Sequence, residues 1–253
     1  MLDSLKRFFA RPALARDLGE ITAWAQRRGY GIKRARREDG FVINGALEGR
    51  AWRIEWGPPQ RPYIQGHELR LRMELDLASD MQMLLLSRAL MDALERLTFD
   101  EFTDSVQTQI GTKTPEEMRW LVMFPKVNMA TLKSLRGRFG AVASVPEAGL
   151  SWLEGALAQA LGQAADGFLS DEPPFVLMTL RGRLYLRMQL VAPEPAALAA
   201  ALALFETAAV QVQRVASASA DGAADRAAAW DSTANTAWQS FQPDTVPDPT
   251  DRR

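Results

Sequence analysis

Hydrophobic and polar residues alternate strictly in several short segments of the chain. Residues 68–75 carry leucine or methionine at every second position, with Arg70, Arg72 and Glu74 between them. Residues 50–56 alternate in a similar way. Because successive side chains of a strand point to opposite faces of a sheet, both segments predict strands with one buried face and one polar face.

Two antiparallel hairpins are expected from this alternation. Their strands are residues 41–46 with 50–56, and residues 175–180 with 183–190. The short connections contain Gly49 and Gly182, and glycine in a short connection between two alternating segments is typical of a hairpin. Residues 57–62 contain three prolines, which exclude a central strand and predict a loop.

Apolar residues at helical spacing predict several helices. They cover residues 2–11, 13–28, 81–97, 146–165 and 195–214, with a shorter helix that starts at Thr114. Gly29 stands where a helix-ending glycine is expected. Ser79 and Asp80 are expected to cap the helix over 81–97. In the helix that follows Thr114, the apolar residues Met118, Leu121 and Val122 are expected to face inward. Residues 106–110 are a candidate short strand, and residues 126–145 have no firm assignment.

Two strand segments resemble each other residue by residue. Residues 69–75 and 184–190 are identical at five of seven positions, and each is expected to lie between helices. The pattern predicts an α+β fold of two pseudo-repeated helix–antiparallel strands–helix halves, with a disordered C-terminal tail. The halves share one antiparallel sheet or form two packed sheets. Convergence of two amphipathic strands is the alternative to duplication.

The composition divides the chain into four parts. They are an amphipathic N-terminal helix over residues 1–12, a first half over 13–125 that carries the extra hairpin, a second half over 126–215, and a tail over 216–253. Alanine, serine, aspartate and proline dominate the tail, which predicts disorder. Trp230, Trp238 and Phe241 are unusual in such a segment and form a candidate docking motif for a partner or for the protein's own core.

The composition excludes several kinds of chemistry. The chain has no cysteine, which removes disulfides, thiolate nucleophiles and Cys-based metal sites. Its one histidine, His67, excludes metal sites that need several histidines. The acidic pairs of the chain are sequence neighbours rather than carboxylates opposed across a cleft. No catalytic, cofactor-binding or metal-binding residues are therefore predicted, and an enzyme that uses only Asp, Glu, Arg and Tyr stays as an alternative.

Positive charge is concentrated in the first part of the chain. Residues 1–72 hold 15 Lys and Arg against 8 Asp and Glu, a surplus of +7, although the whole chain has a net charge of −1. A candidate binding surface consists of a basic cluster and three arginines on the polar faces of predicted strands: Arg27, Arg28, Lys33, Arg34, Arg36, Arg37, Arg53, Arg70 and Arg72. Clustered cations of this kind contact phosphates or acidic groups.

Together these patterns predict a non-catalytic protein-binding or adaptor module without a cofactor. Its partner is expected to be another protein, and self-association stays open. The alternative is the binding of a polyanion, either nucleic acid or an anionic membrane surface, through Arg27–Arg37. No apolar stretch reaches the roughly 20 residues of a membrane span, so a cytoplasmic location is expected. Peripheral contact with a membrane through residues 1–11 is the alternative.

Overall fold

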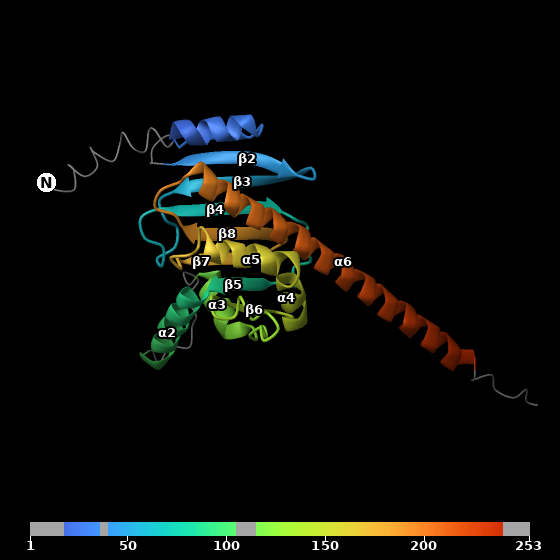
Figure 1. Cartoon of the computed structure of the whole chain (residues 1–253). Helices are drawn as coiled ribbons and strands as arrows, with labels where there is room; N and C mark the ends of the chain where they lie inside the picture. The colour runs from blue at the N-terminus through green and yellow to red at the C-terminus, as the bar shows by residue number, and fades with distance from the viewer. Residues whose placement is uncertain (1–17, 36–39, 105–114, 240–253) are drawn as a thin grey trace, which may run out of the picture. The chain divides into compact units, whose positions relative to one another are not determined.

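The centre of the fold is one antiparallel sheet (Figure 1). The computed structural model describes residues 18–35, 40–104 and 115–239. Within them the sheet has eight strands in the order β1-β2-β3-β4-β8-β7-β5-β6. The strands are β1 (Gly31–Arg34), β2 (Phe41–Leu47), β3 (Arg50–Gly57), β4 (Glu68–Glu74), β5 (Met83–Ser87), β6 (Phe139–Ala143), β7 (Phe175–Leu180) and β8 (Arg183–Gln189). The predicted α+β class is confirmed, and the two halves share one sheet.

The helices of the described residues lie before, between and after the strands in the chain. They are a helix over residues 18–27, then α2 (Arg88–Asp104), α3 (Glu116–Met123), α4 (Pro146–Leu153), α5 (Ala156–Asp166) and α6 (Pro195–Gln239). The chain divides into two compact units, Met1–Val215 and Ala216–Arg253. The boundary coincides with the change in composition, and α6 runs past it to Gln239.

One face of the sheet is apolar and covered by helices. The strand register places one buried residue from each of six strands in a single row: Ile43, Ile54, Leu71, Leu186, Leu177 and Leu85. Helix α5 and the first part of α6 lie across this face (Figure 1). The helix over 18–27 joins them, because Trp24 contacts Tyr30 and Tyr30 contacts Trp52 of β3. This face, called the covered face below, holds the main core.

The first part of α6 belongs to that core. The prediction that no apolar stretch reaches the length of a membrane span is wrong here, because within the described residues Pro195–Ala220 is the one segment long and apolar enough in composition to cross a membrane. Its apolar residues recur at helical spacing, and Leu198, Leu202 and Phe205 are buried. Core helices of globular proteins share this composition. Packing of residues 195–215 within the first unit therefore accounts for the apolar character of this part of α6.

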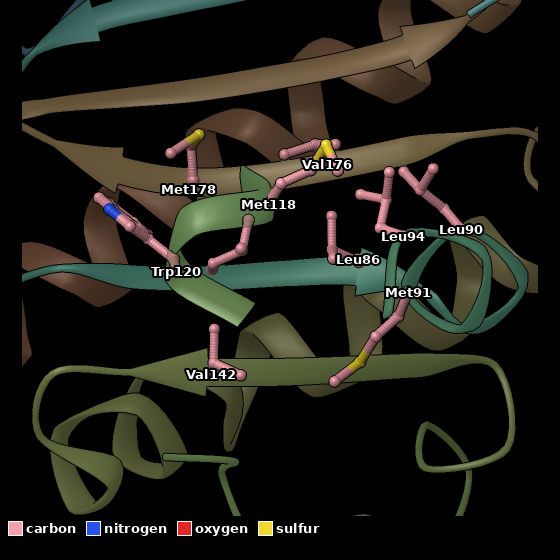
Figure 2. Close-up of a cluster of buried hydrophobic side chains, with 10 residues drawn as sticks. Leu86, Leu90, Met91, Leu94, Met118, Trp120, Val142, Val176 and Met178 are labelled. Carbon is pink, nitrogen blue, oxygen red and sulfur yellow. The ribbon is translucent and has the colours of Figure 1, made fainter. Parts of the chain in front are cut away.

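Within the described residues, helices cover only part of the width of the opposite face of the sheet. Helices α2 and α3 pack on β5, β6 and β7 and close a second apolar cluster around Leu86, Met118 and Trp120 (Figure 2). The cluster ends at Tyr185, which is partly buried against it. Beyond that point, on β2, β3, β4 and β8, most side chains of the same face are polar or charged. This uncovered part is called the open face below.

The predicted helix over 81–97 is wrong in its first part. Met83–Ser87 is strand β5, paired with β6 on one side and β7 on the other, and α2 begins only at Arg88. All five residues of β5 are buried. A strand covered on both faces is a continuous apolar run, and periodicity alone does not separate it from a buried helix. Asp80 consequently lies in a turn and caps no helix.

Three other local predictions are also corrected or completed. Val122 is 49% exposed and does not face inward, whereas Trp120 takes the buried position on α3. The helix expected over 146–165 is interrupted after Leu153, and Gly155 has a φ of 64° that favours glycine. Residues 126–145, which have no firm assignment from sequence, contain β6. The candidate strand over 106–110, the cap at Thr114 and the helix over 2–11 lie outside the described residues.

The two predicted hairpins are present, and their turns have the same backbone form. Glu48 and Gly49 join β2 to β3 with φ angles of 49° and 80°, and Arg181 and Gly182 join β7 to β8 with φ angles of 52° and 77°. Positive φ at both central residues defines the turn whose twist matches that of the flanking strands. The turns therefore fix the registers of both hairpins.

The matching segments of β4 and β8 are neighbours at the middle of the sheet. The register pairs Leu69 with Met188, Leu71 with Leu186, and Met73 with Leu184. Exchanging the two segments leaves this pairing unchanged, so their match is centred on a local two-fold axis. The remaining elements break the symmetry, because a strand follows β4 whereas a helix follows β8. Duplication stays a prediction.

The close contact between Gly45 and Trp52 gives a test of the covered face. A Cβ on Gly45 would lie 2.2 Å from Trp52 Cζ2, and Trp52 is 2% exposed. Gly45→Val is expected to lower the free energy of unfolding by roughly 1–3 kcal/mol, because the buried indole has to move. Urea denaturation measures the change. Ala46→Val, at the next and exposed position, serves as the control. Equal losses in the two variants would contradict the contact.

Candidate functional site

Four arginines lie close together on the open face. The register places Arg53 directly opposite Arg72, and Arg70 directly opposite Arg187. Like charges opposite each other on neighbouring strands destabilise a sheet. Because this part of the sheet carries two such pairs, the local stability depends on negative groups that offset them.

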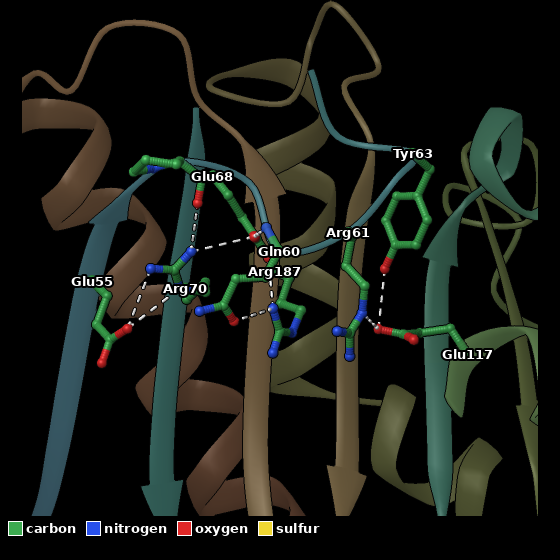
Figure 3. A network of polar contacts seen from close by, with 9 residues as sticks. Glu55, Gln60, Arg61, Tyr63, Glu68, Arg70, Glu117 and Arg187 are labelled. Carbon is green, nitrogen blue, oxygen red and sulfur yellow. Dashed lines mark hydrogen bonds and ion pairs between the residues drawn. The ribbon is translucent and has the colours of Figure 1, made fainter. Parts of the chain in front are cut away.

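Glu68 offsets the pair of Arg70 and Arg187. Its side chain is fully buried, and its two oxygens lie 3.3 Å from Arg70 Nη1 and 2.7 Å from Arg187 Nη1. The backbone N–H of Gln60 donates to Glu68 Oε2 at 2.6 Å. A buried carboxylate is tolerated when charged and polar donors surround it in this way. Glu68 therefore fixes both guanidinium groups and the loop before β4 (Figure 3).

Glu55 partly offsets the other cations. One of its oxygens pairs with Arg53 Nε, and the other lies 3.3 Å from Arg70 Nη2. Partial burial disfavours the charged carboxylate, but Arg53 and Arg70 outweigh that effect and hold the pKa of Glu55 below its ordinary value. Glu55 is therefore ionised near neutral pH and provides a counter-charge to both arginines.

Arg72 has no such counter-charge. It is exposed, and no hydrogen bond or ion pair to it is found within the described part of the chain. A recess of about 140 Å³ lies between it and its neighbours. The lining residues are Arg53, Glu55, Gln60, Arg70, Leu71, Arg72, Tyr185 and Arg187, and this group is called the arginine recess below. Four arginines against Glu55 and the adjoining Glu68 leave a formal charge of +2 around it.

A second polar network continues from the recess toward α3. Arg61 Nε donates to Glu117 Oε1 at 2.9 Å, and the Tyr63 hydroxyl donates to the same oxygen at 3.0 Å (Figure 3). Burial, followed by the charge of Glu117, raises the pKa of Tyr63 far above its ordinary value. Tyr63 is therefore a neutral donor at any ordinary pH. These contacts tie the loop between β3 and β4 to α3.

The predicted binding surface is only partly brought together. Arg53, Arg70 and Arg72 meet in the recess, as their positions on the polar strand faces predict. Arg28 lies near Glu206 of α6, which belongs to the covered face, so it is separated from them by the sheet. Arg27, Lys33 and Arg34 are exposed, the last two on edge strand β1, and Arg36 and Arg37 lie outside the described residues.

Arg187 is the residue of the arginine recess that sequence reasoning misses. It occupies the same position in the second repeated segment as Arg72 does in the first. The repeat itself was therefore the signal: two matching strands that pair antiparallel present their matching arginines on the same face. Gln60 and Glu68 carry no comparable signal, because the loop and the β4–β8 pairing bring them to the site.

The remaining candidates do not join this site. His67 stacks on Trp56 with ring centroids 4.2 Å apart, so it forms part of the packing at the start of β4. Trp230 and Trp238 lie in the helical part of the second unit, and Phe241 lies outside the described residues. Residues 1–11 also lie outside the described residues. Among the described residues, no group of three or more His, Asp or Glu side chains is placed to hold a metal ion.

A larger hollow of about 380 Å³ lies near β6. Its cations are Arg88, Lys126 and Arg136. Arg88 donates through Nη2 to the carbonyl oxygens of Arg136 and Phe139, and Lys126 pairs with Glu95 at 2.9 Å. Two of its three cations therefore have partners already, which favours the arginine recess as the candidate site.

Comparisons with known proteins give only a weak likeness. No protein-family model matches the chain, and no curated protein matches it. One similar solved structure is the mycobacterial trehalose monomycolate transport factor A. The alignment covers 80% of this chain and 95% of that one, with 9% identity and a TM-score of 0.47. A likeness of this size assigns no family, so the function proposed below depends on the geometry of the site.

Removal of the Glu68 charge tests its role as the buried anchor. Glu68→Gln is expected to lower the free energy of unfolding by roughly 3 kcal/mol, because Arg70 and Arg187 lose their shared counter-charge. The control is Glu74→Gln, which breaks an exposed pair with Arg183 and is expected to cost less than about 1 kcal/mol. Urea denaturation compares the two. Equal losses would show that Glu68 is no special anchor.

The pKa of Glu55 predicts a pH dependence of stability. Because the folded-state pKa lies below the ordinary value of 4.5, the carboxylate stabilises the fold above that pH. The stability difference between wild type and Glu55→Gln is therefore expected to shrink as the pH falls below about 4.5. Urea denaturation of both proteins at several pH values between about 3.5 and 7 measures this difference.

The pKa of Glu206 is shifted in the opposite direction to that of Glu55, and it predicts the opposite pH dependence of stability. Burial raises its pKa despite Arg28, so its protonated form is favoured in the folded state. Its stabilising contribution is present at low pH and is lost as the pH rises through the folded-state pKa. The stability difference between wild type and Glu206→Gln is expected to change in the opposite direction to that of Glu55→Gln. The same trend in both variants would contradict the assigned causes.

Proposed function

We propose that the protein is a non-catalytic binding module whose open face binds an acidic segment of a partner protein. The observation that carries this proposal is the arginine recess, where four guanidinium groups face two carboxylates on a part of the sheet that no described helix covers. Arginine is enriched at the centres of protein interfaces, and its planar head matches a carboxylate. An acidic segment supplies the negative groups that the face lacks.

The arrangement supports binding rather than group transfer. The one lining carboxylate, Glu55, is engaged in ion pairs with Arg53 and Arg70, and Tyr185 is the one lining hydroxyl. A recess of about 140 Å³ is also small beside the roughly 300–1,000 Å³ of ordinary ligand pockets. It fits one charged group of a larger partner better than a whole small substrate.

The same face is less suited to a polyanion such as nucleic acid. Nucleic-acid sites present a continuous basic stripe along which several phosphates are neutralised. On the open face Glu55 and Glu74 interrupt the arginines, and Arg28 of the predicted basic cluster lies toward the other side of the sheet. The face therefore favours a short acidic segment with discrete charges.

Site-specific photo-crosslinking in cells that produce the full chain tests the proposal. A photoreactive residue replaces Asn44 or Ala51, which are exposed on the open face, or Gln163 of α5, which is exposed away from it. The open-face positions are expected to give one discrete protein product whose crosslinked segment is acidic. The product is expected to disappear in Arg72→Glu, because that change reverses the charge of the unpaired arginine.

Several outcomes would contradict the proposal. A product of equal yield from Gln163 would show that the open face is not the interface. A product that survives Arg72→Glu would show that the arginines do not carry the interaction. Crosslinks to nucleic acid or lipid from Asn44 and Ala51 would replace the protein partner with a polyanion.

A further inference from the structure

The arginine recess retains more positive charge than its own carboxylates offset. The two glutamates engage Arg53, Arg70 and Arg187, and Arg72 is left without a partner in the described part of the chain. The surplus is a formal +2 within a recess of about 140 Å³. A single carboxylate of a partner offsets only half of it, whereas a dianion offsets all of it.

The recess is also rigid on one side and adaptable on the other. Arg70 and Arg187 are only 16% and 14% exposed, and Glu68 holds both of them. Arg70 Nη1 also donates to the carbonyl oxygen of Pro58 at 3.0 Å. These two heads are therefore fixed before any ligand arrives, which lowers the entropy lost on binding. Arg72 is exposed and free to close on a ligand from the opposite side.

From this arrangement we infer that the arginine recess binds a phosphate-monoester dianion carried by a side chain of the partner protein. A phosphorylated side chain carries a charge of about −1.5 to −2 and three acceptor oxygens. Arginine clusters pair with such groups through charge-assisted, often bidentate, hydrogen bonds. The charge of the ligand matches the surplus of the recess. This inference depends on the proposed function, since it specifies the anchor of the acidic segment.

The shape of the recess favours a side chain over a small free molecule. It opens directly on the exposed part of the face, where Arg53 is 39% exposed. A ligand that enters it leaves the rest of its own chain above the open face, next to Asn44 and Ala51. A phosphorylated side chain in an extended acidic segment meets this requirement.

Three synthetic peptides test the inference with the full-length protein. They share one acidic sequence and differ at a central position, which is serine, glutamate or phosphoserine. Fluorescence anisotropy gives the dissociation constant of each. The phosphoserine peptide is expected to bind roughly tenfold more tightly than the glutamate peptide, since one additional hydrogen bond between charged groups is worth about that factor.

Variants of exposed arginines locate the effect. Arg72→Gln is expected to remove the preference for phosphoserine, and Arg72→Lys to retain part of it, because lysine keeps the charge but not the planar fork. The matched control is Arg50→Gln, which removes an arginine of β3 that is paired with Asp76 outside the recess. This control is expected to keep the full preference. Thermal unfolding checks that all variants fold.

The outcomes separate this inference from the proposed function. If all three peptides bind equally and all lose affinity in Arg72→Gln, the open face binds acidic segments but the phosphate anchor is wrong. If no peptide binds, both the inference and the proposed function fail. If the protein binds phosphatidylcholine vesicles that contain phosphatidic acid and ignores the phosphopeptide, the phosphate comes from a membrane and the inference is overturned.

Discussion

The antiparallel pairing of β4 with β8 is the interaction on which the rest of the structure depends. It joins β1–β4 to the strands β5–β8 and makes one sheet of them. It also sorts the side chains of the two matching segments. The three leucine and methionine pairs of the register lie toward the covered face, and the matching Arg72 and Arg187 lie on the open face. A shift of the register by one residue would exchange these two sets.

The fold was predictable from sequence where a local pattern decides the structure. The hairpins follow from alternation and from the turn glycines Gly49 and Gly182, which have positive φ angles in the structure. β5 was not predictable in this way. Its four apolar residues and Ser87 are all buried because β6 and β7 flank it and helices cover it, and neither of the two strands is its neighbour in sequence.

The site shows the same division between local and distant causes. Arg53, Arg70 and Arg72 were predictable as polar-face residues of alternating strands. The β4–β8 register brings these arginines next to Arg187. The loop before β4 places Gln60 over Glu68, which is buried beneath Arg70 and Arg187. Charge in the sequence therefore indicates which residues take part, whereas tertiary pairing determines which of them meet. The basic cluster Arg27–Arg37 illustrates the limit, since Arg28 lies beside Glu206 on the covered side.

The position of β5 between β6 and β7 constrains the order of folding. β5 follows β4 directly in the chain, yet both of its neighbours in the sheet are made later, from residues 139–143 and 175–180. During synthesis β5 emerges with both hydrogen-bonding edges unpaired and with four consecutive apolar residues, Met83 to Leu86. Such segments associate with other chains until their partners arrive. The first half of the chain consequently completes its sheet only when the second half is available, and contacts this distant in sequence make folding slow.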